Sequence, residues 1–187
     1  LAEIQKLDAG SWFNAEFKEE SIPTLEEVML KIRGRITVNI EIKPESFEAP
    51  APADAIETQV CKIVEMLGMA DSVLISSLAP FFFARIQRWY REQKKSTALR
   101  VAPLQEAPID DEIAVALCRR QKAYSYHPDE SLVTRSLIQM LKADGYQIFP
   151  YTINDEKRME QLIRWGVSGI ISDEPERLVK VIRRLQS

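Results

Sequence analysis

The chain has 187 residues, of which 45% are hydrophobic and 28% are charged, so it is long and apolar enough for one buried core. Its formal net charge of -3 gives no field that attracts a polyanion, so nucleic-acid binding is not expected. No apolar run approaches the roughly 18 residues of a membrane span, so membrane insertion is not expected either. The two cysteines stand alone, which fits a reducing, cytoplasmic compartment. Export stays open, because the sequence begins at Leu1 rather than at Met.

The first segment, residues 1–23, shows no regular period. Its stretch LDAGSWFNAEF predicts an aromatic-bearing loop rather than a helix or a strand. In the helical pattern that follows, Thr24 can act as the N-cap with Glu27 completing a capping box, and Gly34 ends the helix. No strand precedes this helix in the sequence as given.

The stretch RITVNIEIKP, residues 35–44, alternates with a period of two. Because successive side chains of a strand point to opposite faces, one face is apolar and the other is polar. The apolar face comprises Val38, Ile40 and Ile42, and the polar face comprises Asn39, Glu41 and Lys43. A polar face on an exposed edge strand would only meet water, whereas on a parallel strand covered on both faces it would need a function.

From this strand onward, short β-branched runs alternate with amphipathic helical patterns. The predicted strands cover residues 36–42, 73–78, 98–102, 123–127, 147–153 and 168–172. The predicted helices cover residues 54–67, 81–93, 110–120, 131–143, 155–165 and 174–186. Gly145 is expected just after one helix, and Asn154 or Asp155 is expected to cap another. Strict alternation predicts parallel strands joined by crossover helices.

Two α/β architectures accommodate this order. One is an open doubly wound sheet; the other is a (β/α)8 TIM-type barrel of which the last six β/α units and the preceding helix are present. No G-x-G-x-x-G loop follows a strand, which disfavours the first, and the helix without a preceding strand favours the barrel. Residues 1–187 would then form a single, incomplete barrel domain. A barrel without two strands would expose two sheet edges and its lumen to water and be a poor stand-alone fold, so we expect that a part is missing from this sequence.

In a parallel barrel, the polar face of the first strand points into the lumen. Lys43 then lies nearest the C-terminal mouth, where barrel enzymes place their sites. A buried carboxylate and amine lose hydration that a structural ion pair often fails to recover, whereas a site that binds a cation and an anion would recover it. The alternatives are a Glu41–Lys43 pair without function, or a strand in another register.

Other polar residues end the remaining predicted strands: Ser76, Ser77, His127, Tyr151 and Asp173. Serine and aspartate are also common helix N-caps, and a tyrosine can be a core aromatic. His127, the single histidine, precedes Pro128, which indicates a loop-like, exposed position without a role. No Ser-His-Asp set, H-E-x-x-H motif or cysteine nucleophile with a base is present, so hydrolysis by those routes is not expected.

Six segments in order resemble the bacterial glycerophosphodiester phosphodiesterase family over nearly the whole chain: LDAGSWF, IPTLEEV, NIEIK, VLISS, YTIND and GVSGIISDEPE. The resemblance implies a barrel enzyme of lipid and glycerol metabolism. Its substrates would be small glycerophosphodiesters such as glycerophosphocholine or glycerophosphoethanolamine, which are hydrolysed to sn-glycerol 3-phosphate and an alcohol. Residues 1–23 would be the end of a family insertion loop.

The same resemblance implies roles for four residues. Glu41 would be a ligand of a divalent cation, Ca²⁺ or Mg²⁺, and Lys43 would contact the phosphate. Tyr151 matches an aromatic at the pocket wall, and Phe13 would line the glycerol side. Carboxylate oxygens suit these cations, and a metal ion with a lysine can neutralise charge that develops on a phosphoryl oxygen.

The sequence departs from the family at the catalytic centre. The family's two catalytic histidines, in a His-Arg pair at the first strand and a His-Asp pair after the second, do not occur, nor does its E-x-D metal motif. We therefore expect a phosphodiesterase part that lacks the N-terminal catalytic portion, has no catalytic residue of its own and is inactive alone. The alternatives are a degenerate barrel acting as a non-catalytic binding or scaffold module, and another metal-dependent phosphodiesterase or phospholipase of the same barrel type.

Overall fold

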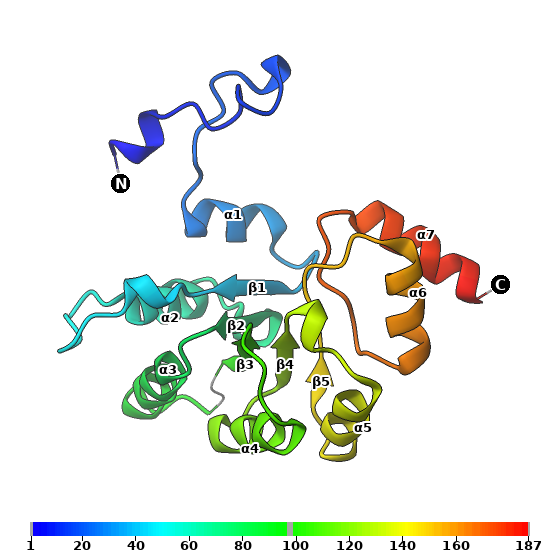
Figure 1. Cartoon of the computed structure of the whole chain (residues 1–187). Helices are drawn as coiled ribbons and strands as arrows, with labels where there is room; N and C mark the ends of the chain where they lie inside the picture. Colours follow the sequence, from blue (N-terminus) through cyan, green and yellow to red (C-terminus); the bar gives the residue numbers. More distant parts are fainter. Residues whose placement is uncertain (1, 97–98, 187) are drawn as a thin grey trace.

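The computed structural model describes residues 2–96 and 99–186 (Figure 1). Its strands are β1 (Val38–Glu41), β2 (Val73–Ser77), β3 (Arg100–Gln105), β4 (Ser125–Pro128) and β5 (Gln147–Ile148). Its α-helices are α1 (Leu25–Ile32), α2 (Ile56–Met66), α3 (Phe81–Glu92), α4 (Asp111–Gln121), α5 (Arg135–Ala143), α6 (Glu156–Trp165) and α7 (Pro175–Gln186). None of the helices in these described ranges combines the length and the apolar character that crossing a membrane requires.

The five strands form one parallel sheet in the sequential order β1-β2-β3-β4-β5. Glu41 of β1 lies beside Ser76 of β2, and Leu104 of β3 lies beside His127 of β4. Figure 1 shows a curved sheet with α2, α3, α4 and α5 along its outer side. This is part of a (β/α) barrel, because the strand order of a doubly wound sheet would reverse at a switch point.

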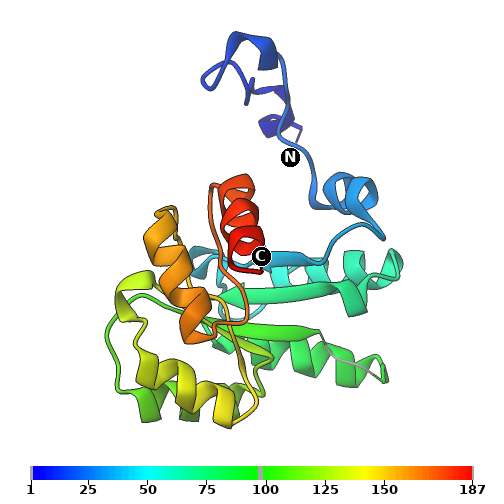
Figure 2. The same cartoon turned by 90° about the vertical axis from the view of Figure 1, so that its right-hand side faces the viewer.

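Residues 2–23 stand apart from the rest of the chain (Figures 1 and 2). They contain two 3₁₀ turns, Ile4–Lys6 and Ala15–Phe17, and are almost entirely exposed. Trp12 and Phe13 contact each other with ring centroids 5.8 Å apart, yet they stay 82% and 71% exposed. The segment is therefore a loop, as predicted, and its aromatic side chains are not buried against the sheet.

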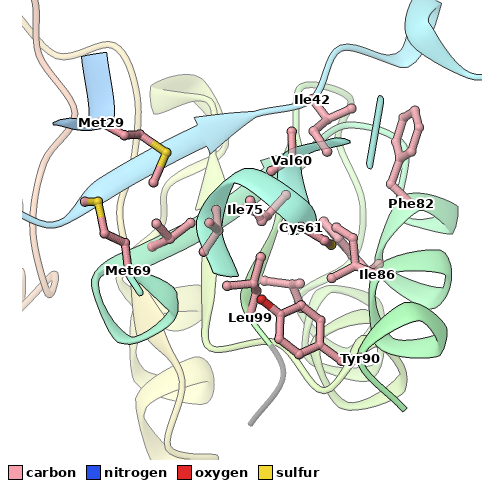
Figure 3. Close-up of a cluster of buried hydrophobic side chains, with 14 of the residues drawn as sticks. Met29, Ile42, Val60, Cys61, Met69, Ile75, Phe82, Ile86, Tyr90 and Leu99 are labelled. Atoms are coloured by element: carbon pink, nitrogen blue, oxygen red, sulfur yellow. The ribbon is translucent and has the colours of Figure 1, made fainter. Parts of the chain in front are cut away.

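The first core fills the space between β1, β2, β3 and the helices α1, α2 and α3 (Figure 3). Ile75 of β2, Cys61 of α2, and Phe82 and Ile86 of α3 are completely buried there. Met29, the buried residue of α1, inserts into the same core. Burying an apolar side chain of this size contributes roughly 1.5–3 kcal/mol, so Met29 holds α1 on the sheet although residues 2–24 contain no strand before this helix.

The second core lies between β4, β5 and the helices α4 to α7. Tyr126 of β4, Ile138 and Leu141 of α5, and Leu162 of α6 are its buried centre. Val181 closes it from α7. The last two helices are therefore attached to the sheet by apolar packing of the same kind as the first three.

The predicted capping residues of three helices are confirmed. Thr24 caps α1: its hydroxyl accepts from the Glu27 backbone N–H, and the Glu27 carboxylate accepts from the Thr24 backbone N–H at 2.7 Å. Asp155, not Asn154, caps α6 by accepting from a backbone N–H of the first turn at 2.8 Å. Gly145 follows α5 with φ of 84°, a left-handed conformation that glycine adopts without steric cost.

The predicted strand 168–172 is not a regular strand. It runs extended beside residues 148–153, where the Ile171 N–H donates to the Pro150 carbonyl at 2.9 Å and the Ile153 N–H donates to the Ile171 carbonyl at 3.0 Å. Pro150 has no N–H to donate, which interrupts the ladder and leaves β5 short. The segment still follows the curve of the sheet.

Besides β5, two further elements have an end that differs from the prediction by three residues or more. The helix predicted over 131–143 begins only at Arg135, because a short 3₁₀ turn precedes it. The strand predicted over 98–102 corresponds to β3, which extends further, to Gln105. Ala98 lies outside the described residues.

Candidate functional site

Strand β1 turns its polar side chains toward the lumen of the partial barrel, as predicted. Val38 and Ile40 pack against the first core, and Ile42, just after the strand, is 2% exposed. Glu41 and Lys43 lie on the opposite face and line a hollow there. The alternation follows from the outer helices, which bury the apolar face of the strand.

The hollow has a volume of about 270 Å³ and opens at the C-terminal end of the sheet. We call it the mouth pocket. It is lined by Asn39, Glu41, Lys43, Ser76, Leu104, Glu106, Tyr151, Thr152 and Ile171. These side chains come from β1, β2, β3 and the segments after β5 and α6, so the fold gathers residues that are far apart in the sequence.

Glu41 and Lys43 form an ion pair at the mouth pocket. The Lys43 Nζ lies 2.7 Å from the Glu41 Oε1, and the two side chains are 67% and 35% exposed, respectively. The hydrogen bond to Glu41, followed by the charge of Glu41, raises the pKa of Lys43, so the ammonium stays protonated. Water screens an ion pair this exposed and makes it a weak contributor to stability. Its groups remain accessible to a ligand.

The two serines that end β2 differ in role. Ser76 faces the mouth pocket, where its Oγ accepts from the Asn39 Nδ2 at 3.0 Å. Ser77 faces the other way: its Oγ donates to the Ile42 carbonyl at 2.6 Å and accepts from the Ala79 N–H at 3.0 Å. Ser77 therefore fixes the backbone at Ile42 and Ala79, and Ser76 belongs to the mouth pocket.

Tyr151 is placed at the pocket wall by its backbone. Its N–H donates to the Pro128 carbonyl at 3.0 Å, and its carbonyl accepts from the Glu130 N–H at 2.7 Å. Its hydroxyl lies 3.5 Å from the Gln105 carbonyl. Burial, followed by the charge of Glu106, raises the pKa of Tyr151, so the phenol stays protonated. The structure thus brings this side chain into the same pocket as the β1 ion pair.

Glu106 is a site residue that the sequence reasoning misses. The strand predicted over 98–102 ends too early to reveal it. Because β3 continues to Gln105, the period of two places Glu106 on the same face as Leu104, and both line the mouth pocket. The signal in the sequence is a carboxylate two positions after an apolar lumen residue.

Two residues considered from the sequence lie outside the mouth pocket. Phe13 belongs to the exposed N-terminal segment and contacts Trp12 and Phe17. A loop without periodic packing gives no local signal for where its side chains lie, so the role of Phe13 at the glycerol side stays a prediction. Asp173 accepts from the Asn154 Nδ2 at 2.9 Å, a contact that ties two loops together.

The expectation of an exposed, loop-like His127 is wrong. It lies in β4, which ends at Pro128, and is 1% exposed. Its Nε2 is 3.0 Å from the Ser125 Oγ, its ring is edge-on to Phe149, and its Nδ1 has no hydrogen-bond partner among the described residues. Burial lowers the pKa of His127 to about 4. At neutral pH the imidazole is therefore uncharged and shielded from water.

A larger hollow, of about 580 Å³, lies at the N-terminal end of β3. Arg91, Arg100 and Lys122 line it, together with Tyr124, over whose ring the Arg100 guanidinium lies at 4.8 Å. The described lining residues include no carboxylate. This hollow therefore offers no acidic ligand for a divalent cation, and the mouth pocket is the site that matches the predicted chemistry.

The mouth pocket offers part of the ligand set of a divalent cation. Glu41 and Glu106 supply carboxylate oxygens, which Ca²⁺ and Mg²⁺ prefer. Across residues 2–96 and 99–186, no three His, Cys, Asp or Glu side chains are grouped so that they could hold a metal ion. A cation at Glu41 would also compete with the Lys43 ammonium. The residues present therefore fit one side of a cation site.

Comparison with known proteins identifies the relatives of this chain. The sequence model of the Glycerophosphoryl diester phosphodiesterase family matches residues 1–177. A glycerophosphodiester phosphodiesterase of Caldanaerobacter subterraneus subsp. tengcongensis is 34% identical over 185 residues, which cover 98% of this chain and 71% of that protein.

Solved structures share the fold. An Oleispira antarctica phosphodiesterase in complex with the product sn-glycerol-3-phosphate is 25% identical with a TM-score of 0.76, over 97% of this chain and 70% of that one. A glycerophosphodiester phosphodiesterase from Parabacteroides distasonis is 19% identical with a TM-score of 0.76, over 100% of this chain and 71% of that one. Because the family model matches residues 1–177 of the 187, the chain belongs to the glycerophosphoryl diester phosphodiesterase family.

Proposed function

We propose that this chain serves the hydrolysis of glycerophosphodiesters, such as glycerophosphocholine or glycerophosphoethanolamine, to sn-glycerol 3-phosphate and an alcohol. The observation that carries the proposal is the water-accessible Glu41–Lys43 pair, 2.7 Å apart, at the mouth pocket. Family membership supports the same substrate class, as does the product bound to the Oleispira antarctica relative.

Lys43 is the residue that binds the phosphate. Its ammonium is a compact charge on a flexible stem, and the contact with Glu41 keeps it protonated at physiological pH. Because most of the side chain is exposed, it can turn from Glu41 to a phosphoryl oxygen without breaking a buried contact. A charged donor at that oxygen stabilises the negative charge that grows as the phosphodiester is cleaved.

Glu41 is one oxygen ligand of a divalent cation, Ca²⁺ or Mg²⁺. When bound, such a cation would polarise a phosphoryl oxygen. Tyr151 forms the wall of the pocket, where its protonated phenol can donate to an oxygen of the substrate. The chain thus contributes an ammonium that contacts the phosphate, a carboxylate that binds the metal ion and a phenol that donates a hydrogen bond.

The sequence contains no histidine suited to act as the general acid or general base of the reaction. General acid and base groups contribute typically about 10²–10⁴-fold each. His127 is the single histidine of the sequence, and it is buried beside Ser125 and Phe149 and uncharged at neutral pH. The isolated chain is therefore expected to bind the phosphate product without turning over the diester.

Binding and turnover should be measured on the same purified chain after its mass has been checked against 21.4 kDa. Isothermal titration calorimetry with sn-glycerol 3-phosphate should show binding that Lys43→Ala weakens about 10- to 100-fold, and Glu41→Ala should remove any enhancement by Ca²⁺ or Mg²⁺. Release of sn-glycerol 3-phosphate from glycerophosphocholine should stay at background. Metal-dependent turnover would contradict the absence of catalytic groups, and a lack of binding would favour the scaffold alternative.

The cytoplasm is the proposed location. Cys61 and Cys118 are both free and buried, which suits a compartment that keeps thiols reduced. Fractionation of cells that produce the protein, followed by immunoblotting, tests this point. Recovery in the exported fraction would contradict it.

A further inference from the structure

The mouth pocket contains two carboxylates in different surroundings. Glu41 is hydrogen-bonded to the Lys43 ammonium at 2.7 Å. Glu106 acts on Lys43 only as one of the weaker charges around it, after Glu41 and Glu45. Among the charges around Tyr151, that of Glu106 comes first in raising the pKa, after burial itself. Glu106 thus lies close to Tyr151 in the mouth pocket that both share with the β1 ion pair.

Glu106 and Tyr151 together present both kinds of hydrogen-bonding group. The carboxylate is an acceptor with about four lone-pair sites, and the protonated phenol can donate or accept. Thr152, the next residue after Tyr151, also lines the pocket. Two neighbouring hydroxyls of a ligand could therefore both donate to the carboxylate, and charge-assisted hydrogen bonds of this kind are the strong ones.

Resting on the proposed function, we infer that Glu106 binds the vicinal hydroxyls of the glycerol group, with Tyr151 beside it, while Lys43 holds the phosphate. The pocket volume of about 270 Å³ is slightly below the range of roughly 300–1,000 Å³ of typical ligand pockets. It therefore suits a small polyol phosphate, and the alcohol on the other side of the phosphate extends outward.

The lining residues disfavour one other role for Glu106, and the test below addresses a second. A quaternary ammonium such as choline is usually held by several aromatic faces, and Tyr151 is the single aromatic among the described lining residues. A cation-ligand role would place Glu106 beside Glu41 on one cation, and the Ca²⁺ affinity measured in the test below distinguishes that role from hydroxyl recognition. Recognition of hydroxyls needs only the carboxylate of Glu106 as a hydrogen-bond acceptor and no further ligand.

The test compares two phosphates that differ only in their hydroxyls. Isothermal titration calorimetry of the complete chain with sn-glycerol 3-phosphate and with n-propyl phosphate gives the ratio of the two affinities. Glu106→Gln should lower this ratio about tenfold or more, because a neutral amide accepts hydrogen bonds less strongly than a carboxylate. The affinity for n-propyl phosphate should stay constant or rise, because a negative charge near the phosphate is removed.

Glu45→Gln is the matched control, since Glu45 also acts on Lys43 by its charge but does not line the mouth pocket. It should leave the ratio unchanged. An unchanged ratio in Glu106→Gln, equal weakening of both phosphates, or a loss of Ca²⁺ affinity would each overturn the inference. If the unmodified chain binds both phosphates equally, the inference alone fails. If it binds neither, and Lys43→Ala changes nothing, the proposed function fails with it.

Discussion

Two polar pairs face the lumen of the partial barrel, and they differ in their access to water. At β1, the side chains of Glu41 and Lys43 are 35% and 67% exposed. At β4, Ser125 and His127 are 0% and 1% exposed. Both pairs are spaced two residues apart on a strand, so the alternating pattern treats them alike. The difference teaches that a ligand site needs a face that is both polar and open, and that periodicity reports only the polarity.

The surroundings of the two pairs also shift the pKa of Lys43 and the pKa of His127 in opposite directions. At the mouth, the hydrogen bond to Glu41 raises the pKa of Lys43 and keeps it charged. In the lumen, burial lowers the pKa of His127 to about 4 and keeps it neutral. A charged, hydrated group is ready for an anion, whereas the interior removes a charge that it cannot solvate. The first pair is suited to binding and the second to packing.

The largest expected effect is on the pH dependence of stability. The folded pKa of His127, about 4, lies below its ordinary value of 6.5, so the unfolded chain takes up the proton first. The stabilising contribution is complete above pH 6.5 and is lost as the pH falls toward 4, and its size is up to about 3 kcal/mol. Urea unfolding across this window should show that His127→Gln, which cannot be protonated, lacks this loss. Parallel pH profiles of the two proteins would show that His127 is not the group responsible.

The second expected effect is on phosphate binding, which should depend on the Glu41–Lys43 pair. Lys43→Ala should weaken sn-glycerol 3-phosphate about 10- to 100-fold, because a charge-assisted hydrogen bond to the phosphate is removed. Its free energy of unfolding should stay close to that of the unmodified chain, since the side chain is exposed. Lys31→Ala, an exposed lysine of α1, removes the same charge and should change neither quantity. Equal weakening by both variants would mean that the phosphate responds to net charge and not to a specific contact.

The sequence predicts the local features of this comparison well. Period-two alternation places Glu41 and Lys43 in the lumen, and the capping box at Thr24 marks the start of α1 correctly. Both signals depend on residues within a few positions of each other. Tyr151 is brought to the pocket by pairing with a distant segment, and the sequence suggests it only through the family resemblance.

The sequence fails where tertiary packing decides the outcome. Pro128 suggests a loop, yet it occupies the last position of β4, where it needs no N–H and its carbonyl still accepts from Tyr151 at 3.0 Å. That pairing extends the strand and buries His127. Glu106 is missed for a related reason, since the end of β3 is set by its neighbours in the sheet and not by its own residues.

The smallest expected effect is a difference in stability between substitutions of two serines, Ser76 at the open β1 site and Ser125 at the sealed β4 site. Ser76 and Ser125 are both completely buried, and each hydrogen-bonds a lumen side chain at 3.0 Å. Ser125→Ala leaves His127 with neither ring nitrogen paired among the described residues, which should cost about 2 kcal/mol. Ser76→Ala frees the amide of Asn39, which is exposed and can bond to water instead, so its cost should stay near 0.5 kcal/mol. Denaturant unfolding at neutral pH measures both. If the two substitutions cost the same, water reaches the lumen at β4 as freely as at β1, and the distinction between an open and a sealed polar pair does not hold.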